Sequence, residues 1–213
     1  MKPRIFSAFT LIEMLTVMAV IAILASLVVS VNAFAHKKAA LVRTEGEIKT
    51  MIAACEGFKA DFGDYPRDKE PTGGPAEKLD PRTDGDPTTA KYRKACLVLY
   101  KALSGDQDAN GKAKEKPYCE FRPDQLQKAA RGGAIQFIKD PFGNSYGYST
   151  AAAAAEEKYR EKLKADLTVA RPSGTSVKGF SPTFDLWSTG GVISKATDPT
   201  TLNNEHKRWV KNW

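Results

Sequence analysis

An apolar run near the start of the chain limits what this protein can be more than any other feature. From Phe9 to Val31 the residues are apolar or small, and Glu13 carries the one formal charge. As a helix, a run of this length extends about 34 Å, which is enough to cross the hydrocarbon core of a bilayer. An ionised carboxylate in hydrocarbon is costly, so one in this position requires a partner or a role. The sequence therefore predicts a membrane-spanning helix over 9–31.

The residues before this run form a short basic leader, 1–8, with Lys2 and Arg4. Leader and run together resemble the class III leader and N-terminal segment of type IV pilins and type II secretion pseudopilins. The resemblance implies that a prepilin peptidase cuts between Ala8 and Phe9 and that Phe9 becomes N-methylated. The family usually has Gly where this chain has Ala8, which implies slower processing.

An ordinary signal peptide or a plain signal anchor is the alternative reading of the same segment. A signal peptide would be cut after the apolar run, and residues 32–40 do offer small side chains there. The run is longer than an ordinary signal core, and Glu13 is the fifth residue after the expected cut, as in pilins. These two features favour the pilin-like reading.

In pilin-like filaments the apolar helices pack together in the filament core, and the resemblance assigns Glu13 to this assembly step. Its carboxylate would pair with the free amine of Phe9 in a neighbouring subunit. Such a pair is much stronger in a low dielectric than in water, and an unpaired carboxylate there is penalised. Glu13 would therefore set the axial register of a helical homo-oligomer.

The helix is expected to continue beyond the apolar run, over residues 32–63. No Pro occurs there, and one stripe of the helix is apolar, formed by Leu41, Ile48, Ile52, Cys55 and Phe62. Gly63, followed by an Asp-Tyr-Pro sequence, predicts the helix end. The continuation is therefore an amphipathic helix that packs on a globular domain.

The remaining residues, 64–213, are enough for one globular α+β domain. Lys2 and Arg4 place the N-terminus in the cytoplasm, so a single-pass protein of the bacterial inner membrane would carry this domain in the periplasm. The net charge of the chain is +7. No aromatic-rich basic motif accompanies this charge, so nucleic acid is an unlikely partner.

Three blocks in the C-terminal region resemble those of the major pseudopilin. They are the DPFGNSYGY block over 140–148, the DLWSTGG block over 185–191 and the final Asn212-Trp213. Alternating Tyr146 and Tyr148 predict a half-buried strand, and residues 184–187 a second strand. The fold implied is pilin-like: a long N-terminal helix packed on a small antiparallel β-sheet, with inserted loops and short helices.

Two insertions depart from the compact family pattern. Residues 67–90 are rich in Pro, Gly, Asp and Thr and predict an irregular loop. Residues 151–170 begin with five alanines followed by straight charged side chains, which favour a surface helix. A short helix is also expected over residues 92–103.

Calcium is the one cofactor that the sequence brings into question. Asp106, Asp108 and Asn110 match the opening of an EF-hand-type loop, but Pro117 stands where a bidentate Glu is expected. The favoured reading of this stretch is a surface turn. The major pseudopilin also binds calcium after its DLxSxG block, and only Asp198 remains as a carboxylate there before Glu205.

The three cysteines leave their pairing open. In an oxidising periplasm Cys96 and Cys119 are candidates for a disulfide, with Cys55 left on the helix. A bridge from Cys55 to either partner, or three free thiols, are alternatives.

Nothing in the sequence indicates an enzyme, because it has two isolated histidines and no nucleophile, phosphate-binding or C-x-x-C motif. His206 in particular reads as part of a charged tail. The expected function is therefore that of a structural pseudopilin subunit that polymerises into a periplasmic pseudopilus for protein export. Its partners would be prepilin peptidase, other pseudopilins and the inner-membrane assembly platform. The alternatives are a type IV pilus subunit, used for adhesion, motility or DNA uptake, and a membrane-anchored periplasmic binding domain.

Overall fold

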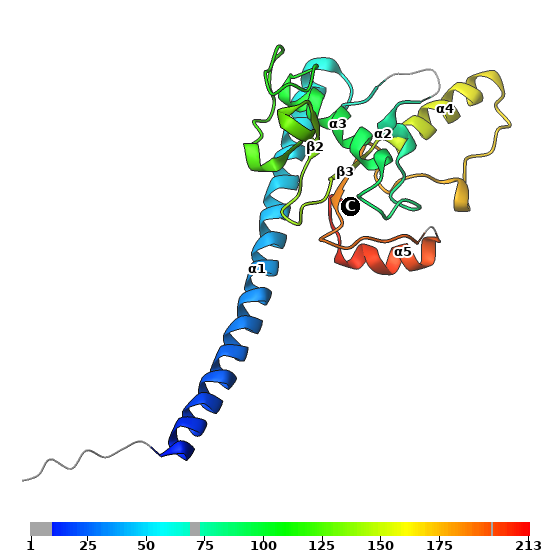
Figure 1. Cartoon of the computed structure of the whole chain (residues 1–213). Helices are drawn as coiled ribbons and strands as arrows, with labels where there is room; N and C mark the ends of the chain where they lie inside the picture. The colour runs from blue at the N-terminus through cyan, green and yellow to red at the C-terminus, as the bar shows by residue number, and fades with distance from the viewer. Residues whose placement is uncertain (1–9, 69–72, 197) are drawn as a thin grey trace, which may run out of the picture. The chain divides into compact units, whose positions relative to one another are not determined.

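The computed structural model describes residues 10–68, 73–196 and 198–213, and the chain divides into two compact units, 1–40 and 41–213. Helix α1, Leu11–Phe62, contributes to both units (Figure 1). The helix ends where the sequence predicts, because Gly63 takes a left-handed φ of 77° and its N–H bonds to the Lys59 carbonyl at 2.7 Å. One long N-terminal helix is thus confirmed.

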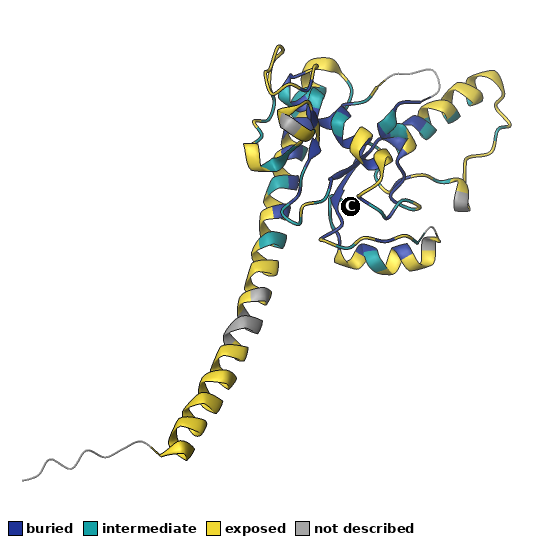
Figure 2. Cartoon of the chain, in the orientation of Figure 1, coloured by how far each residue is buried: buried dark blue, intermediate teal, exposed yellow. Residues whose placement is uncertain are grey.

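Within the first unit, α1 is the one element that the structure describes, and its described side chains are exposed except Ala40, which is partly buried (Figure 2). The sequence predicts a membrane-spanning helix over 9–31. In the parts of the chain that the structure describes, no helix combines the length and the apolar character needed to cross a membrane.

The second unit contains a three-stranded antiparallel sheet in the order β3-β4-β5. Its strands are β3 (Gly147–Ser149), β4 (Asp185–Ser188) and β5 (Val210–Lys211). Tyr148 lies opposite Leu186, and Trp187 lies opposite Lys211. The two predicted strands are confirmed, but the expected half-burial is wrong for β3, because all three of its residues are buried. The core covers both faces of this short strand.

A second, two-stranded sheet pairs β1 (Leu126–Lys128) with β2 (Ile135–Ile138) in antiparallel register. The sequence analysis did not predict it. The two strands are short, and the pairing carries an irregularity between Gln127 and Lys128. Two single-turn 3₁₀ helices, η1 (Pro123–Gln125) and η2 (Ala130–Gly132), precede and separate them.

The helix predicted over 92–103 is α3, Ala90–Ser104, which Thr89 caps at its start and Gly105 ends in a left-handed conformation. The helix predicted in the insertion 151–170 is α4, Ala151–Ala165, and it lies between β3 and β4 in the chain. The C-terminal region adds the 3₁₀ helices η3 (Gly174–Ser176) and η4 (His206–Arg208) around a short helix, α5 (Pro199–Glu205).

The prediction of an irregular loop over 67–90 is only partly right. This segment forms a four-residue helix, α2 (Pro75–Lys78), and it buries Ala76 and Leu79 completely. Pro75 at the first helical position needs no N–H partner, which favours a helix start even in a segment rich in turn residues. The segment therefore belongs to the core of the domain and is more than a surface insertion.

The core of the second unit forms where the later part of α1 meets α3 and the two sheets. One face of α1 buries Ile48, Met51, Ala54 and Cys55 and partly buries Ile52, whereas residues 49, 50 and 53 stay exposed (Figure 2). The remaining members of this cluster come chiefly from α3, β2, β3 and β4, and include Leu99, Leu103, Ile138, Tyr148 and Leu186. Of the amphipathic stripe predicted from the sequence, Ile48 and Cys55 are buried and Leu41 and Ile52 are partly buried, but Phe62 at the end of the helix is 62% exposed.

Candidate functional site

The N-terminal end of α1 holds Glu13, the residue that the sequence assigns to assembly. Thr10 precedes the helix, and its backbone N–H and its hydroxyl both donate to Glu13 Oε2 at 2.9 Å. In return, the Glu13 N–H donates to Thr10 Oγ1 at 3.3 Å. This reciprocal arrangement is a capping box, which satisfies helix N–H groups that have no partner inside the helix.

The capping box occupies the carboxylate of Glu13 within its own chain. A neighbouring amine that pairs with Glu13 has to share or displace the donors of Thr10. The expected cleavage site at Ala8 and Phe9, and the expected methylated amine of Phe9, lie outside the described residues.

The first turns of α1, on both sides of Glu13 in the chain, expose large aliphatic side chains in every direction. The exposed residues are Leu11, Ile12, Met14, Leu15, Val17, Met18, Val20, Ile21, Ile23, Leu24 and Leu27. A helix that is apolar all round is normally buried in protein or lipid. An apolar surface of this extent marks a site of contact with other protein chains or with a membrane.

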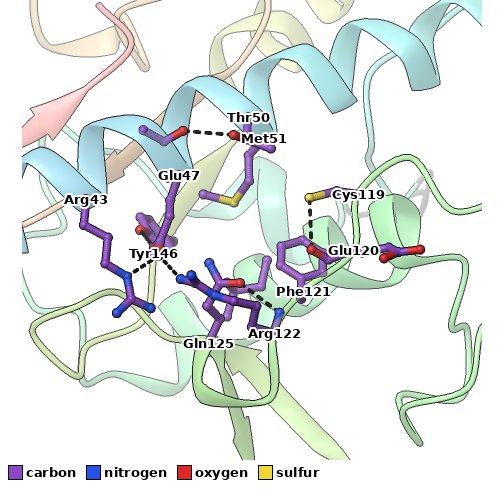
Figure 3. A pocket seen from close by; sticks show the side chains of 12 residues that line it. Arg43, Glu47, Thr50, Met51, Cys119, Glu120, Phe121, Arg122, Gln125 and Tyr146 are labelled. Atoms are coloured by element: carbon purple, nitrogen blue, oxygen red, sulfur yellow. Dashed lines mark hydrogen bonds and ion pairs between the residues drawn. The ribbon is translucent and has the colours of Figure 1, made fainter.

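A groove of about 350 Å³ in the second unit lies between α1 and residues 119–125 (Figure 3). At its centre, Glu47 accepts the hydroxyl of Tyr146 at 2.7 Å. Its other oxygen is held by Arg43 at 2.8 Å and Arg122 at 3.1 Å. Glu47 is therefore paired with both arginines of the groove, which is an arrangement for holding α1 against the domain.

No acid–base or nucleophilic pair arises in this groove. Cys119 lies in its wall, but burial and the nearby Glu120 raise the pKa of its thiol, which keeps it protonated and weakly reactive.

The turn that resembles the opening of an EF-hand-type loop uses its carboxylates internally. Asp106 is buried, and its side chain accepts the Gly111 N–H at 2.6 Å, the Asn110 N–H at 3.2 Å and the Tyr100 hydroxyl at 2.9 Å. Asp108 pairs with Lys114. Within the described residues, no three His, Cys, Asp or Glu side chains gather as metal ligands.

Asp198, the remaining carboxylate of the second expected calcium site, has another role in the structure. It caps helix α5 and accepts the Thr201 N–H at 2.8 Å. This capping bond satisfies one of the free N–H groups of the first turn.

The three cysteines are all free thiols, so the candidate Cys96–Cys119 disulfide is not formed in this structure. Cys96 lies on α3 and faces β2, where its sulfur accepts the Ile138 N–H at 3.3 Å. Burial raises the pKa of the Cys96 thiol to about 11 and also raises the pKa of Cys55. Sequence spacing could not reveal these orientations, because the partner of Cys96 is a backbone group 42 residues away.

Two buried aspartates belong to the sequence blocks that carry the pseudopilin resemblance. Asp140 accepts the Phe142 N–H at 3.0 Å, the Asn144 N–H at 2.8 Å and the Ser188 hydroxyl at 2.5 Å. Asp185 likewise accepts the N–H groups of residues 180 and 181. Burial raises the pKa of both carboxyls, and their bonds to backbone show that they organise turns beside the sheet.

His206 is the residue that sequence reasoning placed wrongly. It was read as part of a charged tail, but the ring is 3% exposed. The burial of His206 cannot be recognised from the sequence, because charged residues flank it on both sides. In the structure the single turn η4 directs its side chain inward.

Comparison with known families gives one match, to the prokaryotic N-terminal methylation motif, over residues 4–29. No curated protein and no solved structure matches the chain. The match covers the leader from Arg4 onward, the capping box and the exposed apolar turns of α1. The start of the chain therefore carries the leader motif of type IV pilin-like proteins.

Proposed function

We propose that this protein is a structural subunit of a type II secretion pseudopilus, which polymerises through its N-terminal helix. The observation that carries the proposal is the methylation motif over 4–29 on a helix whose large aliphatic side chains are exposed. A monomer gains nothing from such a surface, whereas neighbouring subunits in a filament would bury it.

The first step of the proposed assembly is cleavage of the leader between Ala8 and Phe9, which creates a new amine one residue before Thr10. Until then the protein is held at the inner membrane, with residues 41–213 in the periplasm. Anchoring draws support from the leader motif and from the aliphatic side chains of α1.

The second step transfers the Glu13 carboxylate from its own cap to the amine of a neighbouring Phe9. The capping bonds from Thr10 are neutral hydrogen bonds, and a charged amine in a low-dielectric helix bundle is a stronger partner. The pair then fixes where one helix lies along the next. The work of assembly comes from partner proteins, and the chain itself performs no chemistry.

A pseudopilus is favoured over a type IV pilus by the C-terminal blocks, whose residues have clear structural roles. Asp140 organises the turn before β3. Asn212 accepts the Leu186 N–H with its side-chain oxygen and donates its own N–H to the Leu186 carbonyl on β4. A type IV pilus subunit remains the second candidate, since the methylation motif is common to both kinds of filament. A membrane-anchored binding domain is the third.

Deletion of the gene, with complementation by the wild type, separates these functions. The proposal predicts that secreted enzymes accumulate in the periplasm of the deletion strain while surface fibres persist. Loss of surface fibres or of DNA uptake, with normal export, would establish the type IV pilus instead. If neither phenotype appears and the domain is recovered as a monomer, the binding-domain reading is correct.

Glu13→Ala tests the assembly step within the same strain. We expect normal cleavage and a loss of at least tenfold in filament yield and in export. Glu45→Ala is the matched control, because Glu45 is an exposed carboxylate on α1 whose ion pair is with Lys49, one turn away on the same helix. Wild-type export in the Glu13 variant would contradict the proposed role.

A further inference from the structure

The last residues of the chain, 199–213, form a segment that we call the C-terminal clasp. It consists of α5, η4 and β5, and β5 is the outer strand of the three-stranded sheet. Asn212 fastens the clasp to β4, because its side-chain oxygen accepts the Leu186 N–H at 2.9 Å and its amide donates to the Phe184 carbonyl at 3.1 Å. The clasp therefore covers the edge of β4.

His206 lies at the centre of the clasp among aromatic rings. Its ring centroid is 4.2 Å from that of Trp209, 5.4 Å from Phe180 and 6.3 Å from Trp213. Trp187 of β4 stacks on Trp209 at 6.0 Å. The chain has three tryptophans, and all of them belong to this cluster.

The polar atoms of the cluster are incompletely satisfied. His206 Nε2 lies 2.9 Å from the Pro81 carbonyl, so a neutral ring donates from Nε2 and leaves Nδ1 as an acceptor. Among the described residues, Nδ1 has no partner, and neither do the indole N–H of Trp209 and one carboxylate oxygen of Glu205. Buried polar atoms without partners each cost about 1–3 kcal/mol, so the clasp is held less firmly than its aromatic packing indicates.

Charged groups approach His206 from several elements. Lys211 comes from β5. Three charged residues flank the histidine in the chain: Glu205, Lys207 and Arg208. Asp80 and Arg82 line, together with His206, a cavity of about 500 Å³. Burial first, and then Lys211, lower the pKa of His206, while the Pro81 carbonyl and Glu205 act in the opposite direction. A protonated ring is thus disfavoured by its surroundings.

The sign of the resulting pH dependence follows from this lowered pKa. Above the ordinary histidine pKa of about 6.5, the stabilisation that the folded state gains from a neutral His206 is fully present. This stabilisation is lost as the pH falls through the lower pKa that His206 has in the folded state. Asp140 and Asp185 act with the opposite sign, because their raised pKa values mean that their protonation favours the folded state. They cannot cause a release on acidification.

We propose that His206 is an acid-sensitive latch whose protonation releases the C-terminal clasp from β4 and from the Pro81 carbonyl. In a buried imidazolium beside Lys211, the second N–H would have to find its acceptor by a rearrangement of Glu205, because Nδ1 has no partner among the described residues. Release uncovers the edge of β4 and the Trp187 ring, so the sheet edge becomes an exposed surface in mildly acidic surroundings. This inference does not rest on the proposed assembly function.

Tryptophan emission of the full-length chain in detergent micelles tests the latch directly. We expect a red shift between pH 7.5 and 5, with far-UV circular dichroism unchanged, because α1 and α3 stay folded while the indoles meet water. His206→Gln keeps a donor for the Pro81 carbonyl and should abolish this step. His36→Gln, the matched control on α1, should retain it. An identical profile in His206→Gln, or no step in the wild type, overturns the proposal.

Proton NMR of the wild-type chain provides a test that does not depend on how the His206 variant folds. The chain has two histidines, so the His36→Gln variant assigns both ring signals. The proposal predicts that His206 titrates below about 6.5 and that the indole N–H signals move with the same midpoint. Titration of His206 at or above that value would show that Glu205 pairs with the imidazolium, and the latch would be rejected.

Discussion

The two parts of helix α1 show opposite solutions to the same problem of apolar surface. Between Leu11 and Leu27 the helix is apolar all round, and its large aliphatic side chains are exposed. Between Ile48 and Cys55 it is amphipathic, and its apolar face is buried in the core of the second unit. One continuous helix thus contains a part that needs other molecules and a part that its own domain satisfies.

The difference shows where stability and function reside in this chain. Substitutions in the core of residues 41–213 should alter the free energy of unfolding, because they change packing within the domain. Substitutions on the first part of α1 should leave that free energy unchanged and affect contacts with other molecules. Four predictions test this separation, beginning with the largest expected effect.

Leu99→Ala should lower the free energy of unfolding by about 2–5 kcal/mol, because it removes most of a side chain that is fully buried on α3. Urea unfolding of the full-length chain in micelles, followed by tryptophan fluorescence, measures this value. The matched control is Leu15→Ala on the exposed part of α1, where we expect no measurable change. Similar losses in the two variants would remove the distinction between the two parts.

Gly147→Ala should destabilise the sheet by about 1–3 kcal/mol, since a Cβ at this position would lie 2.1 Å from the Trp187 ring. The control is Gly46→Ala on α1, where a Cβ meets nothing within 4 Å and should stabilise the helix by about 0.5–1 kcal/mol. Thermal unfolding detects the opposite signs. A neutral Gly147 variant would show that the contact between β3 and Trp187 is loose.

Tyr146→Phe should cost about 1–2 kcal/mol, because Glu47 loses the hydroxyl that it accepts at 2.7 Å and is left largely buried. Arg122→Ala removes a second partner of Glu47, but the arginine is more than half exposed, so its loss should cost less than about 1 kcal/mol. Urea unfolding compares the two. A larger loss of stability in Arg122→Ala than in Tyr146→Phe would mean that ion pairs, and not the hydroxyl of Tyr146, chiefly stabilise the groove.

Calcium should have the smallest effect. Asp106 already accepts three hydrogen bonds, so we expect no heat on titration of the full-length chain with millimolar calcium and no shift of the melting temperature. A saturable heat that is lost in Asp106→Ala would show that the turn opens to bind the ion.

How far the sequence predicted this structure depends on the range of the interactions involved. The end of α1 at Phe62, helix α3 and strands β3 and β4 were predicted, because helix periodicity, capping residues and turn residues act over a few positions. Strands β1 and β2 were not predicted from the sequence. Each has only three or four residues, and it is stabilised by its pairing and by the core and not by a local pattern.

The side chains of the candidate sites show the same limit. Glu13 was identified because it interrupts an apolar run, and its bond to Thr10 is local. The burial of His206 and the contact of Cys96 with β2 depend on segments that are distant in the chain, Pro81 and Ile138 respectively. No pattern of neighbouring residues contains that information.

Mass spectrometry of the N-terminal peptide from native membranes tests the central claim that the first part of α1 is an assembly helix released by leader cleavage. The account predicts a chain that begins with N-methylated Phe9. A chain that still begins at Met1, or one cut after Val31 as an ordinary signal peptide would be, would contradict it.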